Sequence, residues 1–164
     1  MLDSSGSPMS ETVTSFRIVS LSEDQAAQTL PLAQITWPEA DLAHWRKFIR
    51  SFATQAARAP SGIVALQDAG DYFCAMFAYR VDLDVRRGLV FNVQLFTVVD
   101  LANSPTFAQQ LLAAAETKAH DLGCSSVEIR LYRAQSNLAV QLRSLGLADT
   151  AAIVSKTVER SLTQ

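Results

Sequence analysis

Residues 89–131 of the chain read LVFNVQLFTVVDLANSPTFAQQLLAAAETKAHDLGCSSVEIRL. Polar and apolar residues alternate over 89–99, which predicts a strand. One face of this strand should carry Phe91, Val93 and Leu95, and the other Asn92, Gln94 and Phe96. Apolar residues then recur at helical spacing between the N-cap Ser104 and Gly123, and a second strand follows over 124–131. Because a strand, a helix and a strand with short connections form a crossover, the two strands should be parallel.

An antiparallel meander is predicted just before this crossover. Strands are expected over 63–67, 72–82 and 89–99, and two turn signals separate them, Asp68-Ala69-Gly70-Asp71 and Arg86-Arg87-Gly88. Strands joined by turns this short pair with their neighbours in opposite directions.

The remaining segments add helices and two further strands. A short strand at 16–21 leads into a capping box at Ser22–Gln25, and Pro31 should kink or restart the helix that follows. Further elements are a helix over 39–58, a helix over 138–145 and a last strand over 152–158. The prediction is an α/β (α+β) fold, a mixed, mostly antiparallel sheet of about six to seven strands with helices on both faces.

Composition indicates one globular domain. The chain has 164 residues, of which 49% are apolar, and a net charge of −2. We expect residues 15–160 to form the domain and the Ser/Thr-rich residues 1–14 to be a disordered tail. The weak negative charge gives no general attraction to nucleic acid or to an anionic membrane. No signal peptide or apolar run long enough to span a bilayer is visible.

Few residues suit a metal or a nucleophile. The two cysteines, Cys74 and Cys124, lie in apolar runs outside any CxxC pair, which indicates buried free thiols and a reducing, cytoplasmic location. The two histidines, His44 and His120, are far apart and each is predicted on a helix surface. We therefore expect no metal site.

A family resemblance rests on the second half of the chain. The segments 111–116 and 119–124 look like the long central helix of the GNAT family, the GCN5-related N-acyltransferases, and the exit from that helix. Asn137 and Leu145-Gly146-Leu147 look like the family's final helix and its Leu-Gly-Phe turn. The order of elements also matches, so the resemblance covers residues 15–160. It implies the GNAT fold and acetyl-CoA as cosubstrate.

The resemblance also implies a set of cofactor-binding positions. The main chain of Phe96, Thr97 and Val98 would pair with the pantetheine amides. The helix N-terminus would hold the diphosphate through Asn103, Ser104, Thr106, Phe107 and Ala108, since free N–H groups and the helix dipole favour an anion there. In the last helix, Asn137 and Arg143 would contact the cofactor. For these two the alternatives are a simple helix cap and a solvated side chain.

This sequence departs from the family pattern at the helix N-terminus and at the proton donor. Thr106 stands where the family has glycine, and Pro105 removes a backbone donor. Leu142 stands where the family often has a tyrosine that protonates the leaving thiolate. Tyr132, at the end of the preceding strand, is the substitute, unless it only packs.

Two carboxylates are candidate general bases. Glu128 lies on the strand before Tyr132, and Asp100 lies at the mouth of the crossover. For Glu128 the alternative is an ion pair with Arg130 or Arg133.

The resemblance and the departures from it imply two alternative functions. The first is transfer of an acetyl group from acetyl-CoA to a small-molecule amine or a peptide, with the Trp37-Pro38-Glu39 connection and the Arg80–Arg87 hairpin bordering the acceptor pocket. Glu39 would attract a cationic amine there. The second is a non-catalytic binding or regulatory module that has kept the scaffold and lost acetyl-CoA. Either is compatible with a homodimer.

Overall fold

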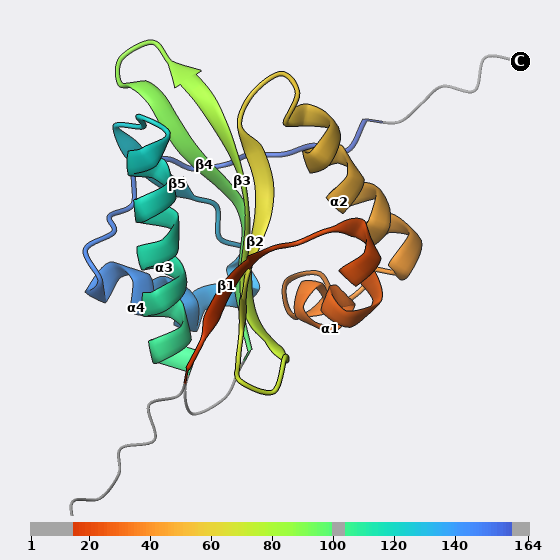
Figure 1. Ribbon diagram of the computed structural model, residues 1–164. Coiled ribbons are helices and arrows are strands. Elements are labelled where there is room, and N and C mark those ends of the chain that lie inside the picture. The colour runs from red at the N-terminus through yellow and green to blue at the C-terminus, as the bar shows by residue number, and fades with distance from the viewer. Residues whose placement is uncertain (1–14, 100–103, 159–164) are drawn as a thin grey trace, which may run out of the picture.

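The computed structural model describes residues 15–99 and 104–158 (Figure 1). Within them five strands form one sheet in the order β1-β2-β3-β4-β5. Their bounds are β1 Arg17–Ser20, β2 Ser61–Gln67, β3 Phe73–Asp84, β4 Gly88–Val98 and β5 Ser126–Ile129. Neighbours pair antiparallel except β4 and β5, which are parallel, as the crossover predicted. The predicted tail, residues 1–14, lies outside the described residues.

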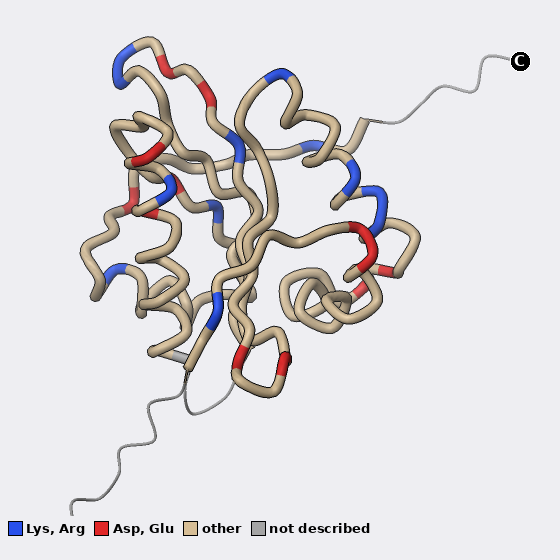
Figure 2. Tube along the Cα trace, viewed as in Figure 1, with Lys and Arg blue, Asp and Glu red and all other residues tan. Residues whose placement is uncertain are grey.

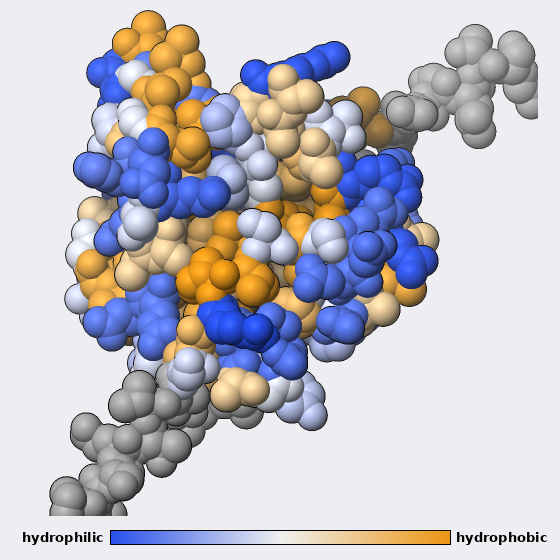
Figure 3. All heavy atoms as spheres, in the orientation of Figure 1, coloured by the Kyte–Doolittle hydropathy of each residue, from blue (hydrophilic) through white to orange (hydrophobic). Residues whose placement is uncertain are grey.

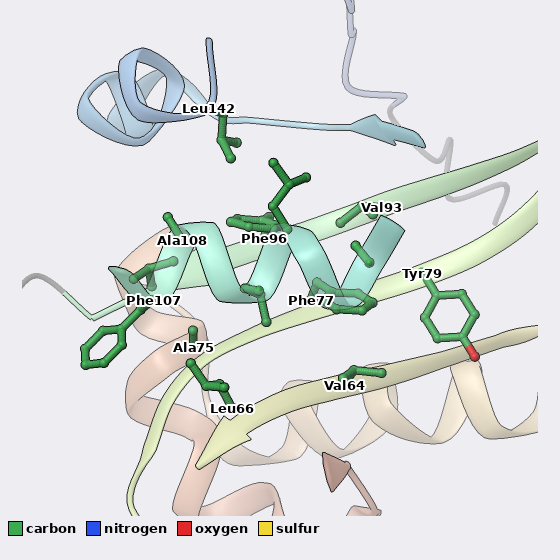
Figure 4. Close-up of a cluster of buried hydrophobic side chains, with 14 of the residues drawn as sticks. Val64, Leu66, Ala75, Phe77, Tyr79, Val93, Phe96, Phe107, Ala108 and Leu142 are labelled. Atoms are coloured by element: carbon green, nitrogen blue, oxygen red, sulfur yellow. The ribbon is translucent and has the colours of Figure 1, made fainter. Parts of the chain in front are cut away.

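Helices cover both faces of this sheet (Figure 1). The first face carries α1 Ala26–Thr36 and α2 Leu42–Gln55, preceded by the 3-10 turn η1 Glu23–Gln25. The second face carries α3 Ser104–Asp121 and, after the 3-10 turn η2 Arg133–Gln135, α4 Ser136–Ser144. Each face has its own buried cluster. The α3 side holds Val64, Leu66, Phe77, Phe96, Phe107 and Leu142 among others (Figure 4), so both predicted helix layers are confirmed.

The residues predicted to form a helix cap and two turns have the expected hydrogen bonds and backbone conformation. The N–H of Ser22 donates to Oε1 of Gln25 at 3.0 Å, one arm of the capping box. The Asp68 carboxylate accepts from the N–H of Gly70 at 2.8 Å inside the first turn. Gly88 has φ of +77°, a left-handed conformation that suits the second turn. α1 continues through Pro31 as a single helix, so it does not restart there.

A β-bulge in β4 overturns the predicted alternation of that strand. Ala78 pairs with Leu95 and Tyr79 with Val93, so Gln94 is an extra residue. Phe91, Val93 and Phe96 therefore all face the α3 side, while Leu95 faces the α1 side. The prediction that grouped Leu95 with Phe91 and Val93 is wrong beyond the bulge, because one inserted residue moves every later side chain to the other face.

The predicted last strand is also wrong. Residues 151–158 have no strand pairing and are exposed, including Ile153, Val154 and Val158. Their β-branched composition favours an extended backbone, but a strand also requires a hydrogen-bonded neighbour. The described sheet thus has five strands rather than six to seven.

The surface mixes both signs of charge. Figure 2 shows Lys and Arg interspersed with Asp and Glu on the strands and helices. Apolar side chains gather at the tip of the β3–β4 hairpin (Figure 3), where Leu83 is 81% and Val85 99% exposed. In the described part of the chain, none of the helices combines the length and the apolar character that crossing a bilayer requires.

Candidate functional site

β4 and β5 pair over only part of the length of β4. The register joins Val90–Val93 to Ser126–Ile129, and the N–H of Arg130 then donates to the carbonyl of Val93 at 2.9 Å. β4 continues to Val98, whereas β5 ends at Ile129, which pairs with Val93. Over 94–98, the side of β4 that faces away from β3 is therefore not paired with any strand of the described residues, and we call this stretch the free edge of β4.

The free edge presents main-chain groups of alternate residues. The N–H of Val99 donates to the carbonyl of Cys74 at 2.9 Å, on the β3 side. Because successive residues of a strand direct their N–H and C=O groups to opposite sides, those of Phe96 and Val98 point toward the free edge. The bulge at Gln94 lies directly before them, and bulges near such sites re-aim the groups that follow.

Gln135 bridges the free edge to its surroundings and was not predicted as a site residue. Its side-chain amide is buried and donates to the Phe96 carbonyl at 2.6 Å and to Oγ1 of Thr36 at 3.3 Å. Its Oε1 accepts from the N–H of Tyr132 at 3.0 Å. One side chain thus connects β4, the end of α1 and the loop after β5. Its bond to the Tyr132 N–H is one arm of a capping box, but Tyr132 is not the Ser or Thr that marks such a box in a sequence.

The side chains of the predicted pantetheine segment are packed. Phe96 lies in the α3-side cluster, and Val98 is 9% exposed. The Thr97 hydroxyl donates to the carbonyl of Leu32 at 3.2 Å. Only the main chain of this segment faces the free edge, which is the form of recognition that the resemblance implied.

The predicted diphosphate site is described only in part. Asp100 and Asn103 lie outside the described residues, as does the side chain of Ser104. Phe107 and Ala108 are buried in the core (Figure 4), and Thr106 is exposed on the first turn of α3. The helix N-terminus is present, with a branched side chain in its first turn.

α4 carries the two remaining predicted cofactor positions, Asn137 and Arg143. Arg143 is bonded through its guanidinium to Asp149 at 3.1 Å. Asn137 is exposed at the start of the helix, two residues after the buried Gln135. Leu142 is 1% exposed and fills the core.

Glu128 makes an ion pair that the sequence did not predict. Its carboxylate lies 2.6 Å from Nη2 of Arg87 rather than beside Arg130 or Arg133, because Arg87 closes the hairpin next to β5. The hydrogen bonds from Arg87 to Glu128 and then to Asp84 raise the pKa of the Arg87 guanidinium. Asn92, directly opposite Glu128 in the register, donates to Asp82 at 3.1 Å. This polar network lies at the hairpin end of β4, before the free edge begins.

Tyr132 lies close to the free edge. It is half-buried, its N–H is held by Gln135, and its ring packs edge-on against Trp37 with 5.8 Å between centroids. Trp37 in turn packs against Phe48 of α2 at 5.4 Å. Of the predicted catalytic residues that the structure describes, Tyr132 is thus the one beside the free edge, and the Trp37–Glu39 connection adjoins it.

Comparisons with known proteins agree with this geometry. Neither a protein-family model nor a curated protein matches the sequence. Among solved structures, the aminoglycoside 6'-N-acetyltransferase AAC(6')-Ih of Acinetobacter baumannii is 17% identical, with a TM-score of 0.72 over 90% of this chain and 100% of the other. A complex of aminoglycoside N-acetyltransferase AAC(6')-Iy with CoA gives 13% identity and a TM-score of 0.74 over 93% and 100%.

A ribosomal-protein-alanine N-acetyltransferase from Brucella melitensis is also similar, at 14% identity and a TM-score of 0.70 over 87% of this chain and all of the other. These identities are low, so the likeness concerns the arrangement of the backbone. The element order, the parallel β4–β5 pair and the covered sheet match the same architecture. The chain has the fold of the GNAT acetyltransferases.

Proposed function

We propose that the chain is an N-acyltransferase that moves an acetyl group from acetyl-CoA to an amine. The observation that carries the proposal is the free edge of β4. It presents the N–H groups of Phe96 and Val98 and the carbonyl of Val98 beside a strand that has ended. A pantetheine arm has two amides, and an extended amide chain pairs with a strand edge through the main chain alone. The similar AAC(6')-Iy structure contains CoA.

The reaction is direct attack. The amine, as free base, uses its lone pair to form a bond to the thioester carbonyl carbon, the C–S bond breaks, and the thiolate takes up a proton. The nitrogen gives up its extra proton to a base or to water. Tyr132 is our candidate for the proton donor because it adjoins the free edge. Glu128 and Asp100 remain candidate bases, but Glu128 is engaged by Arg87.

The second candidate function, a non-catalytic binding module, is favoured by one contact. Gln135 already donates to the Phe96 carbonyl, so part of the free edge is satisfied by the protein itself. Thr106 also supports the binding module, because it puts a branched side chain in the first turn of α3, where the family has glycine.

Titration with acetyl-CoA and desulfo-CoA, with amide hydrogen exchange as readout, separates the two. We expect micromolar binding by calorimetry and slower exchange of the Phe96 and Val98 amides. The Val99 amide is an internal control, since it is already bonded to Cys74. Absence of both heat and protection would reject acetyl-CoA as cosubstrate and favour the binding module.

The acceptor, the assembly and the location are parts of the same proposal. The neighbours include an acetyltransferase whose structure contains sisomicin, and for this chain we propose a small-molecule amine or a peptide, in a cytoplasmic protein that can form a homodimer. Light scattering at high concentration tests the homodimer: a monomer mass would remove it.

A further inference from the structure

An aromatic cavity lies between the end of α1 and the start of α2. Its volume is about 340 Å³, and its lining consists of Trp37, Glu39, Ala40, His44, Trp45 and Phe48. We call it the aromatic pocket. Both tryptophans of the chain are in its wall.

The rings of the aromatic pocket are fixed by their own contacts. The buried Trp45 donates its indole N–H to Oγ1 of Thr29 at 2.9 Å. Phe48 stacks on Trp45 with 5.4 Å between centroids, and Trp37 packs edge-on against Phe48. Because Trp37 and Phe48 are only half-buried, they leave ring surface available to a ligand.

The charged groups of the pocket favour a cation. Asp41, which caps α2, is occupied: it accepts from the N–H of His44 and lies 2.8 Å from the ring Nδ1 of that residue. Glu39 is exposed and forms no ion pair with any described residue. A carboxylate without a partner beside tryptophan and phenylalanine rings is the combination that attracts an organic ammonium, through charge and through the negative ring faces.

The pocket is connected to the free edge of β4 by three contacts. Trp37 packs on Tyr132, the N–H of Tyr132 is held by Gln135, and Gln135 donates to the Phe96 carbonyl. A ligand in the aromatic pocket would therefore lie next to the proposed cofactor site.

We propose that the aromatic pocket binds the acceptor as an ammonium ion with an apolar, preferably aromatic, flank. The charge would lie near Glu39, and the flank on Trp37 and Phe48. The assignment as acceptor site rests on the proposed transferase function, whereas binding of the ammonium itself does not.

Intrinsic tryptophan fluorescence is the direct test, because the pocket contains every tryptophan of the chain. The probes are 2-phenylethylammonium and its neutral analogue 2-phenylethanol, titrated at millimolar concentration without acetyl-CoA. We expect a saturable change with both, and a Kd for the ammonium that is lower by about three- to tenfold, as a cation–π contact and an exposed carboxylate predict.

Two variants locate the effect. Glu39→Gln should weaken the ammonium by roughly two- to fivefold and leave the alcohol unchanged. Trp37→Phe should also weaken the ammonium more than the alcohol, because tryptophan is the stronger cation–π partner. Glu116→Gln makes the same charge change at an exposed position of α3 and should alter neither Kd.

The outcomes separate this proposal from the transferase. Equal Kd values for the two probes, no saturable change with either, or the same loss in Glu116→Gln as in Glu39→Gln would overturn the ammonium site, whatever acetyl-CoA does. Ammonium binding together with failure to bind acetyl-CoA would keep the pocket and reject the transferase. With both bound, mass spectrometry should detect N-acetyl-2-phenylethylamine. If it does not, the pocket is not the acceptor site.

Discussion

Replacing Gln135 with alanine tests whether one buried amide holds the free edge of β4 in place. The substitution removes the donors to the Phe96 carbonyl at 2.6 Å and to Thr36 at 3.3 Å, and the acceptor for the Tyr132 N–H at 3.0 Å. Leaving a buried polar group unsatisfied costs about 1–3 kcal/mol. With two main-chain groups affected, and some water able to enter, we expect a loss of about 2–4 kcal/mol in the free energy of unfolding.

Urea denaturation followed by circular dichroism measures this loss. For a chain of this size, about 2–4 °C of Tm accompanies each kcal/mol, so Tm should fall by roughly 5–15 °C. Gln135→Met, which keeps the side-chain length but not the hydrogen bonds, should lose most of the same stability. Gln109→Ala, at an exposed position of α3, should stay within about 0.5 kcal/mol of the parent. If Gln135→Ala is equally harmless, the bridge contributes nothing and our reasoning about it is wrong.

Three further predictions concern the core, the pH dependence and the thiols. Phe107→Ala, at 4% exposure, should cost about 3–5 kcal/mol in urea denaturation, and a loss below 1 kcal/mol would show that Phe107 is not a core residue. Hydrogen bonds from the N–H and the ring of His44 lower the pKa of Asp41 from its ordinary value of 3.8, so the Tm should decline as pH falls below that value. The decline should be less steep in Asp41→Asn, which keeps the cap but cannot ionise. If Tm falls with pH in parallel in the parent and the variant, this reasoning is wrong. Burial raises the pKa of both Cys74 and Cys124, so both thiols should react slowly with thiol reagents near neutral pH. Cys74 should react more slowly than Cys124 because it is more deeply buried. Rapid labelling of Cys74 in the folded protein would refute its placement.

Much of the fold could be predicted because its signals are local. Each turn and cap depends on a few adjacent residues, such as Asp68 bonding to Gly70, and the crossover rule then fixed the direction of β5. The two errors are nonlocal. The bulge at Gln94 is visible only when β4 is paired with β3, and the absence of a last strand reflects missing pairing rather than unsuitable residues.

The candidate site was less predictable for the same reason. Gln135 acts across 39 and 99 residues of sequence, on Phe96 and Thr36, and no local pattern shows such a contact. The Glu128–Arg87 pair likewise joins an edge strand to a hairpin. The family resemblance named Phe96–Val98 for main-chain recognition, and these residues belong to the free edge. It also named Phe107 for the diphosphate, but the side chain of Phe107 fills the core.

The bulge at Gln94 also shapes how this gene can vary. The side chains of β4 fill two separate cores, and Gln94 is the extra residue between Val93, which faces the α3 side, and Leu95, which faces the α1 side. Without Gln94, the residues Val93, Leu95 and Phe96 would follow plain alternation, so each would still face its present core. Many amino acids should therefore be tolerated at position 94, and a one-codon deletion there should be milder than deletion of Val93 or Leu95, which removes a core side chain. A deep mutational scan that included deletions would show position 94 permissive to substitution and more tolerant of loss than its two neighbours.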